Sequence, residues 1–277
     1  MRALRAIGTL LLIWLVTGCV TVDRYGNIIE TPKPKKEKPV EFNLASIAIK
    51  PNWSPADVQI SMVLAGLPLK PPARFQLPYL PDVGNQGAQP SGTAWAAGYV
   101  AFSIHRRRDG QKTYSCSPSF IYNQLHRANQ GIEIINTLNF LQTSGCSDLK
   151  HMPYVDFDYT TRPTGPAIVD AARNRISGFG RVDFTDVNQV RAHLLQGSAI
   201  IATLRVTDNF LKLKKLHWKK PRGVYMGRHT VAVVGYDQKL RAFLIQNSAG
   251  TEWGEKGYAY VPYDWFIRLT GQAYVLW

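Results

Sequence analysis

Three separated segments of the chain contain polar side chains of kinds that serve in catalysis. Gln86 lies in VGNQG, His229 in RHTVAVVGYD and Asn247 in IQNSAGTEWGEKGY. An imidazole can take a proton from a nucleophile and return it to a leaving group. Taken alone, each segment also has a structural interpretation, because a histidine in a strand is usually part of the core and Asn-Ser-x-Gly usually forms a turn. Order and spacing therefore decide between the two interpretations.

That order and spacing resemble those of the papain-like cysteine peptidases. Six residues after Gln86 an apolar helix containing Trp95 begins, as in the glutamine and nucleophile segment of that family. His229 lies 137 residues beyond position 92, within the interval expected for papain-like enzymes. Asn247 begins a segment close to the family pattern of Asn-Ser-Trp-Gly followed by Trp-Gly and Gly-Tyr. The resemblance extends from about Phe75 to the C-terminus and implies a papain-like fold.

The resemblance also implies a role for each matching residue. In the family, a cysteine thiolate at a helix N-terminus is the nucleophile, and the helix dipole and a nearby imidazolium lower its pKa. An asparagine orients the imidazole, and a glutamine side chain helps to stabilise the oxyanion. These roles fall on His229, Asn247 and Gln86, but the nucleophile position is Gly92. Because glycine has no side chain, we expect a catalytically inactive protein.

Two further features bear on activity. Ala249 replaces the tryptophan that usually follows Asn-Ser, so we expect the His-Asn pair to be wetter than in the family, although Trp253 remains. Ser91 and Thr93 flank the nucleophile position, but successive helical residues point about 100° apart, which turns both hydroxyls away from the histidine. A peptidase or acyl transferase that uses Thr93 or Ser91 as a nonstandard nucleophile is the alternative.

The elements that would position these residues follow an α+β pattern. Residues 94–105 are apolar almost all round, Ser117-Pro118 opens a second helix, and residues 131–145 form a third that stops at Gly145. A helix capped by Asp186 precedes four strand-like segments, at 198–206, 229–237, 242–248 and 258–263. We expect a helical half at about 84–165, an antiparallel β half at about 166–277, and a cleft between them.

The first 18 residues have the three parts of a secretory signal, with two arginines, an apolar run and small residues before Cys19. Val-Thr-Gly-Cys resembles the bacterial lipoprotein box, so Cys19 is expected to carry lipid, and Val20 after it predicts the outer membrane, facing the periplasm or the cell surface. A cleaved signal with an unmodified cysteine is the alternative. Residues 19–74, including the Pro- and Lys-rich stretch 31–39, are expected to form a tether to a domain at 75–277.

The remaining cysteines, Cys116 and Cys146, would lie in an oxidising compartment, which favours a disulfide over two buried thiols. With three cysteines and no clustered histidines, the chain has no zinc-site spacing, and we expect no metal or cofactor.

Charge points to an anionic partner. The net charge is +14. One segment before the histidine contains seven cations and no acid: Lys212, Lys214, Lys215, Lys219, Lys220, Arg222 and Arg228. A solvated face, with Leu211, Leu213, Leu216 and Trp218 on the apolar side of a hairpin strand, is the alternative to an anion-binding or partner-binding patch. Nucleic acid, which would stack on Trp218, is a less suitable partner at the outer membrane than lipid, glycan or protein.

Together these features predict a catalytically inactive, lipid-anchored module of the cell envelope that binds an extended peptide or a partner protein. A structural part of an assembly, with the cleft filled, is a further alternative.

If Cys19 is lipidated, Cys19→Ser should abolish lipid labelling and release the protein from membrane pellets, because no other apolar run after it is long enough to span a bilayer. Metabolic labelling with an alkyne fatty acid measures this. Equal labelling of the variant and the parent would remove the lipoprotein hypothesis.

Overall fold

The computed structural model describes residues 13–15, 18–22, 28–29 and 71–277. The first three stretches are strands β1 (Ile13–Leu15), β2 (Gly18–Val22) and β3 (Ile28–Ile29), which form an antiparallel sheet within a separate unit, Met1–Glu41. Most of the expected signal sequence and the tether at 31–39 lie outside the described residues. No helix in the described part of the chain is both long and apolar enough to cross a membrane.

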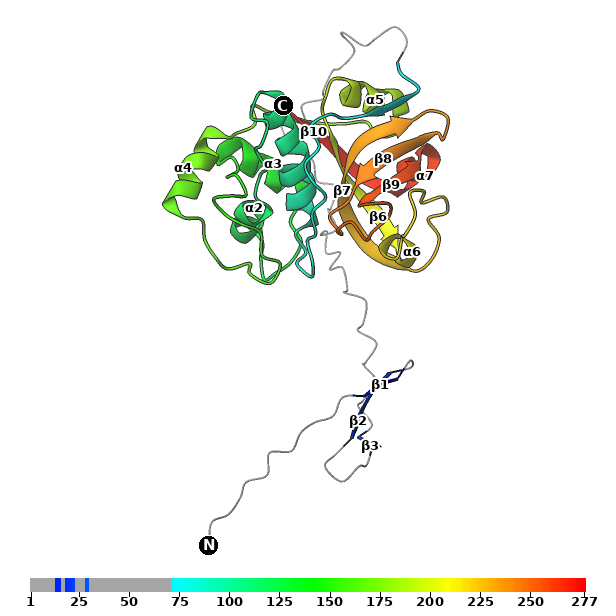
Figure 1. The fold of residues 1–277 in the computed structure, drawn as a ribbon. Coiled ribbons are helices and arrows are strands. Elements are labelled where there is room, and N and C mark those ends of the chain that lie inside the picture. The colour runs from blue at the N-terminus through cyan, green and yellow to red at the C-terminus, as the bar shows by residue number, and fades with distance from the viewer. Residues whose placement is uncertain (1–12, 16–17, 23–27, 30–70) are drawn as a thin grey trace. The chain divides into compact units, whose positions relative to one another are not determined.

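The helical half begins with the expected apolar helix. This helix is a π-helix, η2 (Ala94–Phe102), that continues as α1 (Ser103–Arg108), and every η2 residue is buried. It is followed by α2 (Pro118–Leu125), α3 (Ile134–Thr143) and α4 (Gly165–Arg173) (Figure 1). The Ser117 hydroxyl caps α2 by accepting from the Phe120 amide at 3.1 Å, and Gly145 after α3 has φ +78°.

The other half is an antiparallel sheet with three short helices. Its strands are β4 (Arg74–Gln76), β5 (Phe179–Arg181), β6 (Ile200–Thr207), β7 (Tyr225–Asp237), β8 (Ala242–Gln246), β9 (Tyr258–Pro262) and β10 (Thr270–Leu276). The strand order is β5-β10-β6-β7-β8-β9, and β4 also pairs with β7. The helices are α5 (Val187–Leu195), α6 (Asp208–Leu211) and α7 (Tyr263–Leu269). The α+β class and the antiparallel sheet are confirmed.

Strand β7 is the centre of this half. It is longer than its sequence pattern indicates, because pairing with β6 continues back to Tyr225 opposite Thr207. Its later residues pair with both β8 and β4. The buried helix η2 lies against β7 and β6, so the apolar surfaces of the two halves meet along this strand.

A disulfide between Cys116 and Cys146, with Cα atoms 5.6 Å apart, joins the start of α2 to the end of α3. This confirms the expected pairing. Both cysteines are fully buried under η2, where Gly98 faces them. A Cβ on Gly98 would lie 2.7 Å from Cys116 Sγ, so only glycine lets the helix pack this closely.

The bond closes a loop with a sequence separation of 30 residues. Chain entropy therefore predicts that the double variant Cys116→Ser/Cys146→Ser loses about 3 to 4 kcal/mol of unfolding free energy. Urea denaturation of the parent with and without reductant, beside the variant, measures this. An unfolding midpoint that is the same in all three samples would contradict the prediction.

Candidate functional site

The structure brings together the four residues that the sequence assigns to the site. Gly92 lies just before η2, His229 lies in β7, Asn247 directly follows β8, and Gln86 lies in the loop before the helix. All four are buried. A Cβ on Gly92 would lie 3.0 Å from His229 Cε1, 3.2 Å from its Nδ1 and 3.1 Å from Gln86 Oε1. Position 92 therefore faces the imidazole, as a nucleophile would.

Asn247 fixes the ring of His229. The two side chains meet through His229 Nε2 and Asn247 Oδ1 at 2.6 Å. The Ser248 amide donates to the same oxygen at 2.9 Å, which identifies that end of the asparagine side chain as the acceptor. His229 Nε2 therefore carries the proton, and Nδ1 is the nitrogen turned toward Gly92. Burial lowers the pKa of His229 to about 4 despite this hydrogen bond, so the ring is neutral near neutral pH.

The His-Asn pair is almost fully buried although Ala249 stands where the family has tryptophan. His229 and Asn247 are only 3% and 4% exposed. Phe210 of α6 lies against the imidazole, with ring centroids 5.9 Å apart, and Trp253 packs on Phe210 at 4.9 Å. The Trp253 indole also donates to the Phe210 backbone oxygen at 2.6 Å. These two rings shield the His-Asn hydrogen bond from solvent, although no sequence pattern singles out Phe210.

Gln86 is turned in an unexpected direction. Its Nε2 donates to the Gln89 backbone oxygen at 2.9 Å, and its Oε1 accepts from the Ser248 hydroxyl at 2.7 Å. Because a backbone carbonyl can only accept, the Gln89 contact decides which end of the amide is nitrogen. The end that faces Gly92 is therefore an acceptor. An oxyanion needs donors, so Gln86 in this orientation does not form the oxyanion site that the resemblance implies.

Ser91 and Thr93 both have their hydroxyls engaged away from the histidine. Tyr154 Oη donates to the Gln86 backbone oxygen at 2.8 Å, so the Ser91 hydroxyl, 2.7 Å from that phenol, must donate to it. Thr93 Oγ1 lies 3.0 Å from Thr230 Oγ1. The structure therefore agrees with the expected side-chain directions, and neither hydroxyl points toward His229.

The cation-rich segment lies beside the site but does not form the hairpin strand considered above. Between α6 and β7 it is irregular, with Leu211, Leu213 and Leu216 partly buried and the lysines exposed. Trp218 is 2% exposed and donates to Asn209 Oδ1 at 2.9 Å, so it is not a stacking platform for bases. The cations exposed here are Lys212, Lys214, Lys215, Lys219, Lys220 and Arg222.

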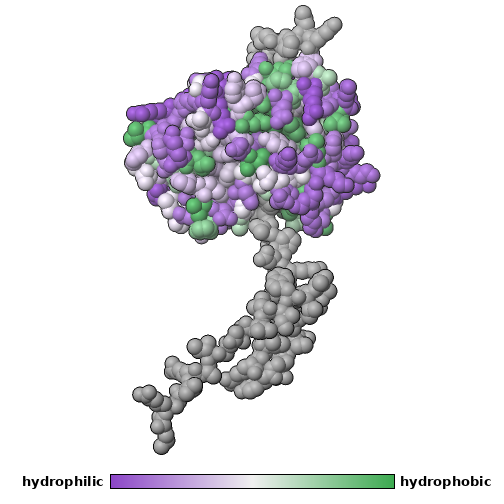
Figure 2. All heavy atoms as spheres, viewed as in Figure 1, coloured by the Kyte–Doolittle hydropathy of each residue, from purple (hydrophilic) through white to green (hydrophobic). Residues whose placement is uncertain are grey.

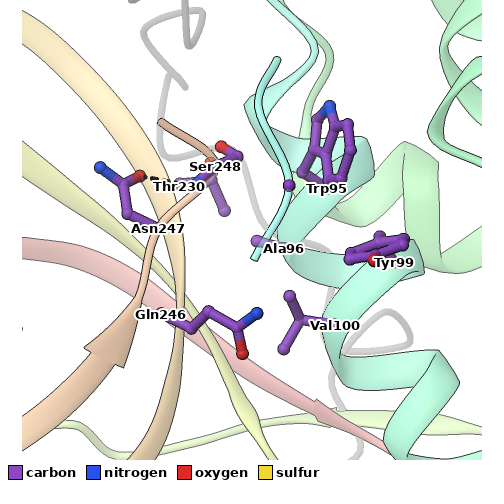
Figure 3. Close-up of a pocket in the computed structure, with 9 residues that line it drawn as sticks. Trp95, Ala96, Tyr99, Val100, Thr230, Gln246, Asn247 and Ser248 are labelled. Atoms are coloured by element: carbon purple, nitrogen blue, oxygen red, sulfur yellow. Dashed lines mark hydrogen bonds between the residues drawn. The ribbon is translucent and has the colours of Figure 1, made fainter. Parts of the chain in front are cut away.

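Between the two halves, a small cavity of about 10 Å³ lies beneath the site. Figure 3 shows Trp95, Ala96, Tyr99 and Val100 from η2 on one side, and Thr230 and Gln246 to Ser248 from the sheet on the other. This volume holds about one water molecule, not a ligand. Among the described residues, no group of His, Cys, Asp and Glu is arranged to hold a metal ion.

Burial of neutral His229 predicts an acid-sensitive fold. The folded-state pKa of about 4 lies below the ordinary value of 6.5, so the unfolded chain takes up the proton first as pH falls. Unfolding free energy should therefore fall between about pH 6.5 and pH 4, and less so in His229→Gln.

An NMR titration checks this directly, and the ring signals of His229 should remain those of a neutral imidazole at about pH 5.5. His193, whose pKa burial also lowers to about 4, is the second buried histidine, and His193→Gln removes its signals without touching the site. Protonation of His229 near pH 6.5 would be contrary to the prediction.

Comparisons with known proteins identify the family of this chain. The family model for papain family cysteine proteases matches residues 80–266. An uncharacterized peptidase C1-like protein of Acanthamoeba polyphaga mimivirus is 25% identical over 199 residues, 65% of this chain and 64% of that protein. Cathepsin B-like CP2 of Giardia intestinalis is 27% identical over 192 residues, 65% of this chain and 63% of that protein. The chain thus spans slightly less than two thirds of the length of these relatives.

Solved structures share the fold. Xylellain, a cysteine protease from Xylella fastidiosa, matches with a TM-score of 0.68 and 24% identity over 74% of this chain and 85% of that one. The Carica candamarcensis cysteine protease CMS1MS2, solved with E-64, matches with a TM-score of 0.60 and 18% identity over 74% and 98% of the two chains. The segment that the family model matches includes η2, which begins just after Gly92, as well as β7 and the asparagine segment. The chain therefore belongs to the papain family of cysteine proteases.

Proposed function

We propose that this chain is a non-hydrolytic member of the papain family that binds an extended peptide or a partner protein at the boundary of its two halves. The observation that carries the proposal is the lack of a side chain at Gly92 together with the tight fit around that position. His229 Cε1 and Gln86 Oε1 lie 3.0 and 3.1 Å from where a Cβ would be, closer than most Cβ contacts in proteins. The space for a nucleophilic side chain is therefore partly filled by the residues that would serve it.

Two other observations support a binding role. Gln86 presents an acceptor to position 92, so a tetrahedral intermediate would meet an oxygen instead of a donor. The neutral imidazole of His229 has no thiol to deprotonate. The relatives are named as peptidases and proteases, but these names belong to those proteins and do not assign an activity to this chain. Binding needs the fold but not the nucleophile, so it is the function that the site supports best.

For the cellular setting, we propose a bacterial lipoprotein of the outer membrane, anchored through Cys19. The support for this is the sequence of the first 20 residues, with its short apolar run and the small residues before the cysteine. The disulfide between Cys116 and Cys146 agrees with an oxidising compartment outside the cytoplasm.

A restored nucleophile tests the inactive site. The parent should hydrolyse no member of a fluorogenic peptide library. Gly92→Cys places a thiol opposite His229, but the ring and Gln86 must shift by a few tenths of an ångström, and a missing oxyanion donor alone costs about 100- to 1000-fold in kcat. We therefore expect labelling by a thiol-directed epoxide, with at most weak hydrolysis.

Gly92→Ala is the matched control, since it adds the Cβ without the thiol and should be neither labelled nor active. Both variants are compared with the parent by thermal unfolding, to separate loss of fold from loss of chemistry. Hydrolysis by the parent that disappears in Ser91→Ala or Thr93→Val would overturn the proposal and favour a hydroxyl nucleophile.

A further inference from the structure

We propose that the segment of residues 219–226, which leads from the loop after α6 into the start of β7, is a contact surface for an anionic phospholipid membrane. Its exposed apolar side chains enter the interfacial layer of the lipids, and the cations beside them meet the phosphates. The inference goes beyond the proposed function, because it depends neither on peptide binding nor on a lipid attached to Cys19.

Exposed apolar side chains follow one another in this segment. Every residue from Arg222 to Met226 is exposed. Val224, Tyr225 and Met226 are 69%, 52% and 42% exposed. In the part of the chain that the structure describes, no other three consecutive large apolar side chains are exposed. Exposed apolar side chains that gather in one place and are bordered by polar residues are typical of an interaction site.

The backbone of the segment is fixed to α6. The Asp208 amide donates to the Val224 backbone oxygen at 3.0 Å, and the Val224 amide donates to Asp208 Oδ1 at 3.1 Å. Asn209 Nδ2 donates to the Lys220 backbone oxygen at 2.8 Å. Gly223 has φ +132°, and a Cβ on it would collide with Asp208 Oδ1, so only glycine allows this close approach. An ordered backbone therefore presents the apolar side chains, which lowers the entropy cost of binding.

Cations directly precede the apolar side chains. Lys219, Lys220 and Arg222 are exposed, and the sequence contains no acid at 209–236. A positive segment of this kind is attracted to the phosphate groups of anionic lipids. Figure 2 shows hydrophilic side chains gathered on the side of the molecule where Figure 1 draws α6, the helix to which this segment is tied.

Two further contacts complete the distribution of charge. Asp208 pairs with Lys212 at 3.8 Å and so offsets one cation of the neighbouring loop. The guanidinium of Arg205 lies 5.0 Å from the centre of the Tyr225 ring, so an additional exposed cation lies beside an apolar member of the segment. The surroundings of the apolar side chains therefore remain positive.

The combination of cations and apolar side chains favours a membrane over other anionic ligands. A lipid surface has phosphates at its boundary and hydrocarbon just below them, which matches cations beside Val224 and Met226, and it needs no groove in the protein. Tyr225 suits the layer between the two, since aromatic rings with a polar end concentrate there. Nucleic acid matches the cations alone, because Trp218 is buried and cannot stack on bases.

A fluorescent label at position 224 tests this contact. Cys19→Ser removes one thiol and the disulfide engages Cys116 and Cys146, so Val224→Cys supplies the only free thiol of the full-length chain. An environment-sensitive fluorophore on this thiol should shift its emission to the blue with vesicles of equal parts phosphatidylglycerol and phosphatidylcholine, because the label leaves water. Vesicles of phosphatidylcholine alone should give no shift.

Ile168→Cys in the same Cys19→Ser chain is the matched control for position. Ile168 is 55% exposed on α4, in the helical half, and a label there should stay in water. The two labelled proteins share the same N-terminal residues, so any membrane contact of those residues affects both alike. A label that responds only at position 224 therefore locates the contact.

The contribution of charge is measured in the protein labelled at position 224, by titration with lipid. Lys220→Gln/Arg222→Gln should weaken binding to the phosphatidylglycerol vesicles about tenfold, and added salt should weaken binding of the parent in the same direction. Arg173→Gln/Arg175→Gln removes the same charge from exposed positions at and just after the end of α4, and its binding should match that of the parent. Thermal unfolding shows that all variants are folded.

The proposal is overturned if the label at position 224 responds no more than the label at position 168, if phosphatidylcholine alone gives the same response, or if Lys220→Gln/Arg222→Gln binds as the parent does. A response to a double-stranded oligonucleotide but not to vesicles would replace the membrane with nucleic acid. A response to a glutamate-rich peptide but not to vesicles would replace it with a protein partner. The peptide-library assay tests the inactive site separately, so failure here leaves the proposed function unchanged.

Discussion

The short hydrogen bond between His229 and Asn247 is the contact on which the rest of the site depends. It joins β7 to the segment after β8, and both side chains are almost fully buried. A buried amide or imidazole that loses its partner costs about 1 to 3 kcal/mol, whereas an intact hydrogen bond contributes about 0.5 to 1.5 kcal/mol net. Asn247 also receives the Ser248 amide, and Ser248 in turn donates to Gln86. The polar residues thus form one connected network, in which each member satisfies another.

This connectivity gives the polar residues of the site a structural role that does not depend on a side chain at Gly92. His229, Asn247 and Gln86 help to close the boundary between the helical half and the sheet. An apolar residue in place of any one of them would leave a neighbour without its hydrogen-bond partner. The persistence of such residues in a sequence is therefore not by itself a sign of catalysis, because packing alone gives a sufficient reason for each of them.

Much of this arrangement could be predicted from the sequence, because the motifs are local. Gln86, His229 and Asn247 are each part of a recognisable segment, and their order specifies the fold that brings them together. The features of the site that the sequence does not predict depend on contacts between residues far apart in the chain. Phe210 covers the histidine from a four-residue helix with no distinctive pattern, and the direction of the Gln86 amide is decided by a backbone oxygen. The extension of β7 back to Tyr225 follows from its pairing with β6, which hydrophobic patterning alone does not indicate.

The disulfide beneath η2 has a consequence for the time before the protein folds. In a reducing cytoplasm the link between Cys116 and Cys146 does not form, and the folded state is then disfavoured by a factor of about several hundred relative to the oxidised protein. The reduced chain therefore spends more time unfolded, and oxidation of the two thiols shifts the equilibrium toward the folded domain. The bond thus couples the folding of this domain to the redox state of its surroundings.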